Sequence, residues 1–499
     1  MKKLTALILA LMLVLGLATS AFADEAATPA AKTYSITINN SAAGYTYDVY
    51  QIFTGDLKEP NAEDPADHQT ANVLSNVTWG TSVTAYNNAA VSGDASAVAD
   101  TLTASNLDQF LAALTLGSAH TSVSTQTEGK YVISGLEPGY YLIKNSAVAV
   151  DGSYTEYIVE VVENSTVNPK GNAPTVVKKV KDTNDSTGTT SDWQDSADHD
   201  LGDDVPFQLT ATLADNVSAY DTYKVIFHDT LSAGLSYNHD AVVKVGGNTV
   251  FNEKDTSQNK PGVSVAYSGT SLTVTITDVT AHGGTDSSVV TVEYTAELNE
   301  TAVIGSAGNP NTVKLEFSNN PYDDDNTGET PDDKVIVFTY KVIVNKVDKD
   351  NNALEGAGFT LYKKNDGSYE LVEAIATGIG AGKNVFSFEG LDDGDYKLVE
   401  STTPAGYNTI ADIEFTVSAE HATDSDNPTL TSLTGEETTG EITFTPDITA
   451  ASLSTDVINR SGTTLPETGG MGTTLFYVVG GILVAAAAVL LVTKKRMAN

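Results

Sequence analysis

Cysteine is absent from this chain of 499 residues, so no disulfide can brace it. An extracellular protein would be free to use disulfides, so any covalent bracing here must use other chemistry. Basic residues are scarce, with 27 Lys and Arg against 65 Asp and Glu and a net charge of -38. Nucleic acid is excluded as a partner, because phosphate binding needs basic patches. The charge suits a soluble, self-repelling surface protein.

Patterns typical of enzymes and of long helices are missing as well. Neither an HExxH nor a GxSxG motif occurs, no cluster has metal-ligand spacing, and the seven His are scattered. The sequence therefore predicts no enzyme, no metal site and no cofactor. Stretches with helical periodicity are few, whereas short alternating runs broken by Gly, Asn and Asp are common. This pattern predicts an all-β chain of tandem modules.

Three modules are predicted between the chain ends, and the first holds a helical insertion between Asn61 and Leu116. The run from Val167 to Pro174 contains two prolines, one Gly and two Asn, and marks the end of the first module. Lys170 lies within this boundary and is expected to be exposed. The predicted parts are a signal peptide (1–23), a first domain (24–172), a middle domain (173–320), an acidic linker (321–333), a C-terminal domain (334–461) and a sorting segment (462–499).

The acidic linker offers clustered carboxylates, which are ligands that calcium prefers. Its spacing does not match an EF-hand loop. A solvated linker is therefore favoured over a calcium site, which stays open as the weaker alternative.

The N-terminus has the order of a secretory signal peptide. Met1 to Lys3 is a short basic start, and an apolar segment rich in Leu runs from Leu4 to Thr19. Ala21 to Ala23 fits the small-x-small cleavage pattern. We predict cleavage before Asp24, so that the mature chain begins outside the cell.

The C-terminus carries a five-residue motif, an apolar run and a basic tail, in that order. The apolar run from Leu475 to Val492 has 18 residues, just enough to span a bilayer, and Lys494 to Arg496 follow it. Basic flanks stay on the cytoplasmic side, so the motif is held just outside the membrane. The alternative is a simple tail anchor that contains the motif by chance. The motif consists of Leu465, Pro466, Glu467, Thr468 and Gly469.

Polar residues stand on the apolar faces of several predicted strands. Residues two apart in a strand share a face, so Lys178 faces inward between Val176 and Val180. The same rule turns one Lys, one acid and one Asn inward in each of two domains. They are Lys178, Asp229 and Asn311 in the middle domain, and Lys346, Glu400 and Asn459 in the C-terminal domain.

A buried Lys or carboxylate is costly unless it is paired. One interpretation is a buried salt bridge with an Asn hydrogen bond in each domain. The other is chemical, because burial lowers the pKa of a Lys and raises that of an acid. A neutral amine could then attack the Asn carboxamide while the acid polarises its oxygen. Ammonia would leave and an isopeptide bond would remain.

The first domain is predicted to lack such a bond. Its segment from Gly135 to Asn145 matches the segment from Gly390 to Glu400 in two Gly, one Leu and one Tyr. Asn145 thus takes the position of Glu400, and no acid is available to relay protons. A lysine, Lys32, does precede the first predicted strand.

Two motifs and the C-terminal signal carry a resemblance to a known family. The segment from Tyr396 to Tyr407 resembles the E-box of sortase-assembled pilins, with Ser401 where Thr is usual and Thr403 where Ala is usual. The segment from Val167 to Lys170 resembles the pilin motif, although Asn168 replaces the usual aromatic residue. The C-terminal motif resembles the cell-wall sorting signal of Gram-positive surface proteins. The chain is therefore similar to the major shaft pilins, with Ig-like domains of the collagen-adhesin type.

The resemblance implies a covalent polymer on the cell wall of a Gram-positive bacterium. A pilin-specific sortase would cleave between Thr468 and Gly469 and pass the acyl group to Lys170 of another identical subunit. A housekeeping sortase and a peptidoglycan precursor would anchor the polymer, and tip and base pilins are further partners that the family implies. A monomeric wall-anchored adhesin that binds a host matrix protein is the alternative, and only Lys170 separates the two from sequence.

Overall fold

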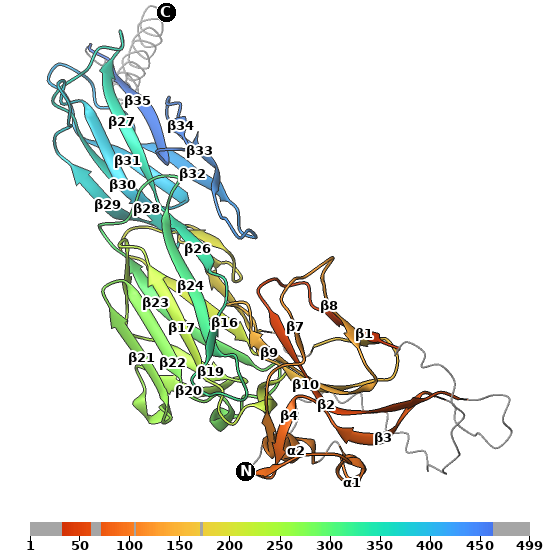
Figure 1. The fold of residues 1–499 in the computed structure, drawn as a ribbon. Helices are drawn as coiled ribbons and strands as arrows, with labels where there is room; N and C mark the ends of the chain where they lie inside the picture. Colours follow the sequence, from red (N-terminus) through yellow and green to blue (C-terminus); the bar gives the residue numbers. More distant parts are fainter. Residues whose placement is uncertain (1–31, 61–70, 104–105, 170–172, 463–499) are drawn as a thin grey trace, which may run out of the picture.

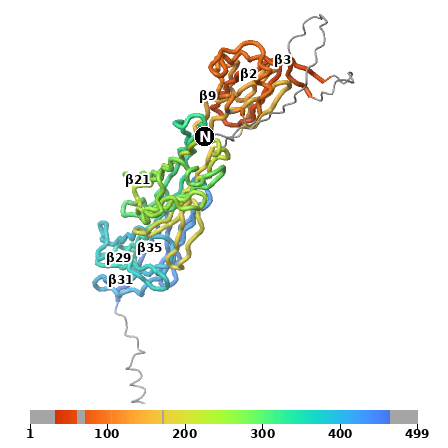
Figure 2. Tube along the Cα trace, turned by 90° about the horizontal axis from the view of Figure 1, so that it is seen from below, coloured from red at the N-terminus to blue at the C-terminus, as the bar shows by residue number. Residues whose placement is uncertain are grey.

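The computed structural model describes residues 32–60, 71–103, 106–169 and 173–462, and these form three β-rich domains. Figure 1 shows the middle and C-terminal domains aligned end to end, with the first domain beside the far end of the middle one. The trace in Figure 2 shows the same elongated order from another side. The predicted all-β class is confirmed. None of the described helices is long and apolar enough to cross a membrane.

The first domain packs two sheets around the buried residues of its alternating strands. One sheet has the order β11-β1-β8 and the other β10-β9-β2-β3, with β7 also paired to β2. The strands are β1 (Tyr34–Asn39), β2 (Thr46–Lys58), β3 (Val73–Trp79), β7 (Thr121–Val123), β8 (Lys130–Leu136), β9 (Gly139–Ala147), β10 (Glu156–Val161) and β11 (Ser165–Val167).

The predicted insertion contains both helices and strands. Its elements are β4 (Val83–Tyr86), β5 (Ala89–Ala90), α1 (Ser96–Ala99), α2 (Leu107–Ala112) and β6 (Leu114–Leu116). The helix expected over Leu107 to Leu116 ends earlier, because the last three residues pair with β4 instead. Phe110 of α2 stacks on Phe53 of β2, so the insertion covers the first domain with a core of its own.

The middle domain is a sandwich of two larger sheets. One has the order β12-β16-β23-β19-β20 with β18 added to β23, and the other β15-β26-β24-β17-β22-β21 with β25 added to β24. The first contains β12 (Thr175–Val180), β16 (Asp204–Thr212), β18 (Leu235–Tyr237), β19 (Val242–Val245), β20 (Asn248–Asn252) and β23 (Val289–Leu298). The second contains β15 (Ser196–Asp198), β17 (Val225–Leu231), β21 (Val263–Ser268), β22 (Ser271–Ile276), β24 (Asn309–Ser318), β25 (Thr327–Glu329) and β26 (Asp333–Phe338).

The C-terminal domain packs the sheet β30-β27-β35-β34 on the sheet β29-β28-β31-β32-β33. Its first and last long strands, β27 and β35, are parallel neighbours. The strands are β27 (Tyr340–Asp348), β28 (Gly358–Asn365), β29 (Ser368–Ile375), β30 (Val385–Leu391), β31 (Gly394–Thr402), β32 (Ile413–His421), β33 (Leu430–Glu437), β34 (Thr445–Asp447) and β35 (Ser452–Asn459).

The boundary between these two domains lies later than the sequence suggested. Part of the expected linker forms β25, and β26 pairs with β24 of the middle domain. The C-terminal domain thus begins after Thr339, not at Lys334, and one residue separates β26 from β27. The side chains of β26 divide between two cores, with Val335 in the middle one and Ile336 in the C-terminal one. This shared strand joins the two domains closely.

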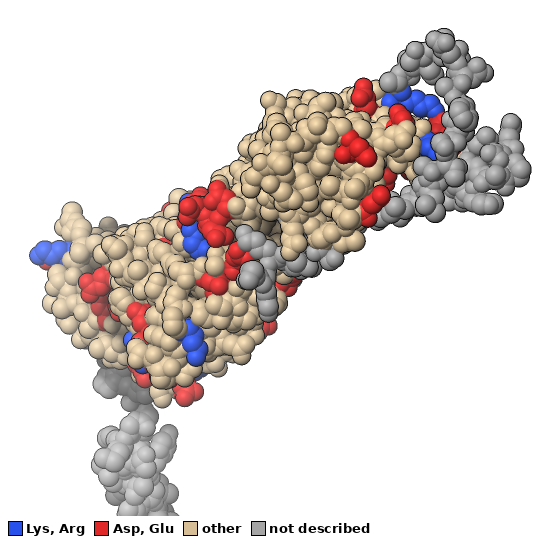
Figure 3. All heavy atoms as spheres, turned by 60° about the horizontal axis from the view of Figure 1, so that its bottom comes forward, with Lys and Arg blue, Asp and Glu red and all other residues tan. Residues whose placement is uncertain are grey.

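The junction between the first and middle domains is less extensive than the one between the middle and C-terminal domains. Two backbone hydrogen bonds cross it, from the Tyr154 N–H to the Asn319 carbonyl at 2.7 Å and from the Glu329 N–H to the Val150 carbonyl at 2.9 Å. On the face shown in Figure 3, acidic side chains are spread along the domains and basic ones are few, in keeping with the net charge of -38.

Candidate functional site

In the middle domain the three predicted residues meet in the core between the sheets. Lys178 lies on β12, while Asp229 and Asn311 lie on the neighbouring strands β17 and β24 of the opposite sheet. Asn311 is opposite Leu231, so Asp229 shares its face of the sheet two residues away. All three side chains are buried, with 0% or 1% exposure. Strand alternation therefore points the three groups at one another.

The hydrogen bonds of this cluster converge on one hydroxyl. The Lys178 Nζ lies 2.6 Å from Asp229 Oδ1 and donates to the Tyr294 hydroxyl at 3.1 Å. That hydroxyl donates to Asp229 Oδ2 at 2.5 Å and accepts from Asn311 Nδ2 at 2.8 Å. Asn311 Oδ1 has no hydrogen bond partner among the described residues. The carboxamide oxygen is thus left open to a proton donor.

Burial sets the electrostatics of this cluster. It lowers the pKa of Lys178, against the opposing charge of Asp229. It also raises the pKa of Tyr294 far above its usual value, so the hydroxyl keeps its proton. A lysine with a lowered pKa releases its proton more readily, which makes its amine a better nucleophile.

Tyr294 is a member of this cluster that the strand patterns did not single out. It lies on β23 and stacks on Phe207 of β16, with a ring centroid distance of 5.4 Å. The alternation of Val290, Val292 and Tyr294 places it on the apolar face. A buried Tyr hydroxyl needs a hydrogen bond partner. A Tyr on the apolar face of a predicted strand was therefore the sequence signal that could have added Tyr294 to the cluster.

The C-terminal cluster is built from a different pairing of strands. Lys346 on β27 and Asn459 on β35 belong to one sheet, where Lys346 is opposite Val457 in the parallel register. Glu400 reaches them from β31 in the facing sheet. Lys346 and Asn459 are fully buried, and Glu400 is 5% exposed. In this domain Lys346 and Asn459 lie in the same sheet. In the middle domain it is the acid, Asp229, that lies in the same sheet as the Asn.

Glu400 holds the amide of this cluster. Its Oε1 accepts from Asn459 Nδ2 at 2.8 Å, and its Oε2 accepts from the Ile410 N–H at 3.1 Å. Lys346 Nζ donates to the Val457 carbonyl at 2.7 Å. Burial lowers the pKa of Lys346 to about 8, although the charge of Glu400 opposes this shift. Within the described part of the chain, Asn459 Oδ1 is unpartnered, as Asn311 Oδ1 is.

The first domain repeats the surrounding fold without the cluster. Gly135 and Gly390 both have a φ of 77°, and the hydroxyls of Tyr141 and Tyr396 each donate to the carbonyl four residues earlier. Asn145, the counterpart of Glu400, accepts from the backbone N–H of Thr155 instead.

Lys32 does not take part in a buried cluster of the first domain either. It is an exposed lysine whose ammonium pairs with Glu59 at 2.6 Å.

Several predicted site residues lie outside the described ranges. They are the cleavage site before Asp24, the acceptor Lys170, the motif Leu465, Pro466, Glu467, Thr468 and Gly469, and the apolar run from Leu475 to Val492. In the sequence, Lys170 falls between Val167, the last residue of β11, and Ala173, which precedes the first strand of the middle domain.

The predicted acidic linker forms local hydrogen bonds. Asp323 accepts from the Asp325 N–H at 3.2 Å and also from the Asn326 side chain. In the part of the chain that the structure describes, the carboxylates that converge closely enough to hold an ion lie at the junction of the middle and C-terminal domains instead.

Three segments of the chain match known protein families. Residues 201–321 match the family described as Gram-positive pilin backbone subunit 2, Cna-B-like domain. Residues 340–429 match the SpaA prealbumin-like fold domain, and residues 459–499 match the LPXTG cell wall anchor motif.

Two relatives illustrate the likeness. The trypsin-resistant surface T6 protein of Streptococcus pyogenes serotype M6 is 27% identical over 259 residues, which are 48% of this chain and 44% of that protein. The match thus spans less than half of that relative. The structure of the T6 backbone pilin of serotype M6 Streptococcus pyogenes, described as modular with three domains, covers 88% of this chain and 100% of its own. Its TM-score is 0.55 at 17% identity, which is a likeness of fold.

Proposed function

We infer from its likeness to Gram-positive backbone pilins that this chain is the structural shaft subunit of a covalent pilus on the cell wall. The observation that carries this function is the presence of a pilin backbone domain at 201–321 and an LPXTG anchor at 459–499 in one chain. A backbone domain supplies a rigid unit, and the anchor supplies an end that can be joined to another molecule. The subunit is a structural protein rather than an enzyme.

The subunits are joined by transpeptidation. A pilin-specific sortase cleaves the peptide bond between Thr468 and Gly469 and holds the threonine as an acyl group. The Lys170 amine of a second subunit attacks this acyl group, which releases the sortase and forms an amide. The housekeeping sortase ends growth by transferring the last subunit to a peptidoglycan precursor. Support for Lys170 is its place between the first and middle domains.

Two isopeptide bonds reinforce each subunit, Lys178 to Asn311 and Lys346 to Asn459. Asp229 and Glu400 promote them by relaying the proton from the amine to the departing ammonia. In support, burial lowers the pKa of both lysines. The buried Asn459 amide donates to Glu400 directly, whereas the buried Asn311 amide donates to Tyr294, which is hydrogen-bonded to Asp229. The bonds close loops of more than a hundred residues, and the disulfide analogy gives about 5 kcal/mol each.

The arrangement has a mechanical consequence. Tension between Lys170 and Thr468 passes through the middle and C-terminal domains and leaves the first domain outside the path. Both domains that carry load have a cluster, and the first domain has none in its described part. Covalent bracing is therefore placed where force would unfold the chain.

The test separates a shaft from a monomeric adhesin, which no observation on the structure favours. A cell-wall extract boiled in SDS is blotted with an antibody to the middle domain. A ladder of covalent multimers is expected for a shaft subunit. A single band near the size of the monomer would reject the proposed polymer.

A further inference from the structure

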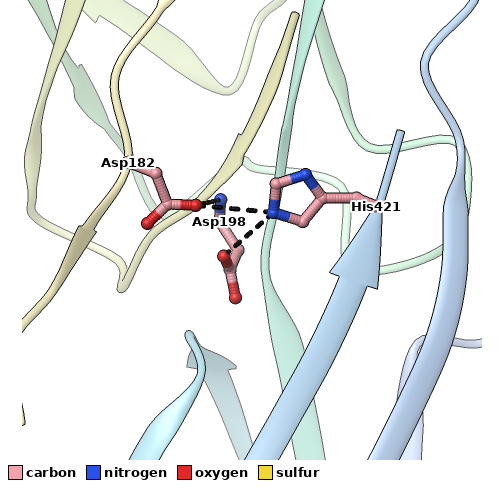
Figure 4. Close-up of side chains that lie close together, drawn as sticks. All are labelled: Asp182, Asp198 and His421. Atoms are coloured by element: carbon pink, nitrogen blue, oxygen red, sulfur yellow. Dashed lines mark hydrogen bonds and ion pairs between the residues drawn. The ribbon is translucent and has the colours of Figure 1, made fainter. Parts of the chain in front are cut away.

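Three titratable side chains meet at the junction of the middle and C-terminal domains. Asp182 follows β12, Asp198 ends β15, and His421 ends β32 of the C-terminal domain. Figure 4 shows both carboxylates turned toward the same ring nitrogen of His421. Their side-chain exposures are 17%, 4% and 7%, so the group is shielded from solvent. Neither the pilus chemistry nor the isopeptide clusters use it.

The distances in this group are longer than those of strong charge-assisted hydrogen bonds. His421 Nε2 lies 3.3 Å from Asp198 Oδ1 and 3.4 Å from Asp182 Oδ2. Charge-assisted hydrogen bonds are usually about 2.7–2.9 Å. Ligand atoms about 2.0–2.1 Å from a tetrahedral zinc ion are separated by about 3.3 Å. The spacing therefore fits ligands that share a small cation.

The other ring nitrogen of His421 is anchored as it is in metal-binding histidines. Its Nδ1 lies 2.7 Å from the Ser196 hydroxyl, which donates to the Ala422 carbonyl at 2.8 Å. That hydroxyl can therefore accept a hydrogen bond from the Nδ1–H group, which leaves Nε2 with a lone pair toward the carboxylates. A metal-binding His almost always uses its second nitrogen in this way.

The two carboxylates are oriented by backbone groups. Asp198 Oδ2 accepts from the Asp393 N–H at 3.0 Å, which turns Oδ1 toward His421. Asp182 Oδ2 accepts from the Asp198 N–H at 3.2 Å. Such outer contacts fix ligands before the ion arrives.

An orphaned hydroxyl beside the group is a second and independent sign of a ligand. Tyr340 at the start of β27 is 1% exposed, and its hydroxyl has no hydrogen bond partner among the described residues. Burial and then the charge of Asp198 raise the pKa of Tyr340 well above its usual value. A buried hydroxyl without a partner is costly, and a water on a metal would supply one.

The neighbouring acidic group shows how the chain neutralises carboxylates by itself. Asp185, Asp200 and Asp392 surround the ammonium of Lys363, which lies 2.9 Å from Asp185 Oδ2 and 2.5 Å from Asp200 Oδ2. That group contains its own cation and needs no other. Among the described residues, no lysine or arginine forms an ion pair with the group around His421, so its cation is either a proton on Nε2 or a metal.

We propose that Asp182, Asp198 and His421 bind one divalent transition-metal ion of the zinc class, with the fourth position taken by water beside Tyr340. The nitrogen ligand and the short spacing favour such an ion over calcium, which takes six to eight oxygen ligands. Because two ligands come from the middle domain and one from the C-terminal domain, the ion fastens the junction. The site lies outside the covalent linkages and does not depend on the pilus function.

The experiment uses the mature chain after dialysis against a chelator. Titration with zinc chloride in a calorimeter should show one site per chain, and cobalt chloride should give the visible absorption of tetrahedral Co²⁺. Both signals should be lost in His421→Gln and in Asp198→Asn. His239→Gln is the matched control, because its ring is exposed in the middle domain and pairs with one carboxylate only.

The competing outcome is a protonated His421 that bridges the two carboxylates. Burial opposes that charge, but hydrogen bonds with Asp182 and Asp198 raise the pKa of His421 to about 9. In that case zinc would leave both the calorimetric trace and the melting temperature unchanged, and the proposal would be overturned. Circular dichroism of His421→Gln and Asp198→Asn establishes that each variant is folded. Zinc binding that persists unchanged in both folded variants would equally reject the site.

Discussion

Lys178 Nζ and Asp229 Oδ1 lie 2.6 Å apart in a core where both side chains have no exposed surface. A buried ion pair of this kind is weak evidence for stability, because desolvation of two charges offsets their attraction. The Asn311 amide is hydrogen-bonded to Tyr294, which contacts both members of the pair. The pair can therefore take part in a reaction with that amide. The pair is better placed to exchange a proton than to hold two charges.

The first prediction concerns the mass of the mature chain. It should be lower than the sequence mass by two ammonia losses, one from each domain with a cluster. Asp229→Ala and Glu400→Ala should each restore one ammonia and lower the melting temperature by roughly 10–20 °C for about 5 kcal/mol. A mass equal to the sequence would exclude both bonds, and a third loss would show that the first domain also forms one.

Tyr294 provides a sharper test of the middle cluster. Tyr294→Phe removes the hydroxyl that contacts all three reacting side chains but keeps the ring packed on Phe207. Slow or incomplete ammonia loss is expected in the middle domain, with normal loss in the C-terminal domain, as peptide mass mapping would show.

The matched control is Tyr223→Phe, since Tyr223 is a fully buried tyrosine of the same domain whose hydroxyl has no partner within the described ranges. If Tyr294→Phe and Tyr223→Phe form the bond equally fast, the Tyr294 hydroxyl has no part in the chemistry.

The sequence predicted the inward direction of all six cluster residues because each lies in a strand with period-two alternation. Lys178 lies between Val176 and Val180, and all three are buried in the structure. The pattern is local, so it could place each group on a face but could not show that β12 and β24 belong to different sheets.

The domain boundary at residue 334 was missed for a physical reason. Strand β26 begins with Asp333 and Lys334, which read as a continuation of the acidic linker. The four residues after them are all buried, without alternation, because they serve two cores.

The junction site was beyond prediction from sequence. Asp182 and His421 are 239 positions apart and neither lies on a strand face with a strong pattern. Only the packing of β32 against the middle domain brings them together.

The linkage between subunits leads to a prediction on living cells. Lys170→Ala should abolish the covalent ladder, because no amine remains at the boundary to accept the acyl group. The monomer should still be folded and reach the surface, since Lys170 precedes the first strand of the middle domain. The readout is a blot of the boiled wall extract beside flow cytometry of intact cells.

Lys179→Ala is the control for this experiment, because it removes a partly exposed lysine nearby. A ladder that persists in Lys170→Ala would mean that another lysine is the acceptor.

Removal of the sorting motif tests the other end of the linkage. Deletion of residues 465–469 should leave protein in the membrane fraction or in the medium and no polymer, because the sortase has no bond to cleave. Fractionation followed by blotting measures this. Polymer of normal length would place the cleavage site elsewhere.

The last prediction is a pH dependence of bond formation in the C-terminal domain. Only the neutral amine of Lys346 can attack Asn459, and burial lowers its pKa to about 8. Below that pKa the neutral fraction rises about tenfold per pH unit, and above it the fraction levels off. The rate of ammonia loss should therefore rise about tenfold from pH 6 to pH 7 and flatten above pH 9.

The cluster assembles only on folding, so chain recovered unfolded from inclusion bodies starts without the bond. Asn311→Ala protein, in which only this bond can form, is refolded by dilution at each pH and its mass is followed over time. Lys346→Ala in the same background should lose no ammonia at any pH. A rate that is flat or falls between pH 6 and pH 8 would show that deprotonation of Lys346 does not limit the reaction.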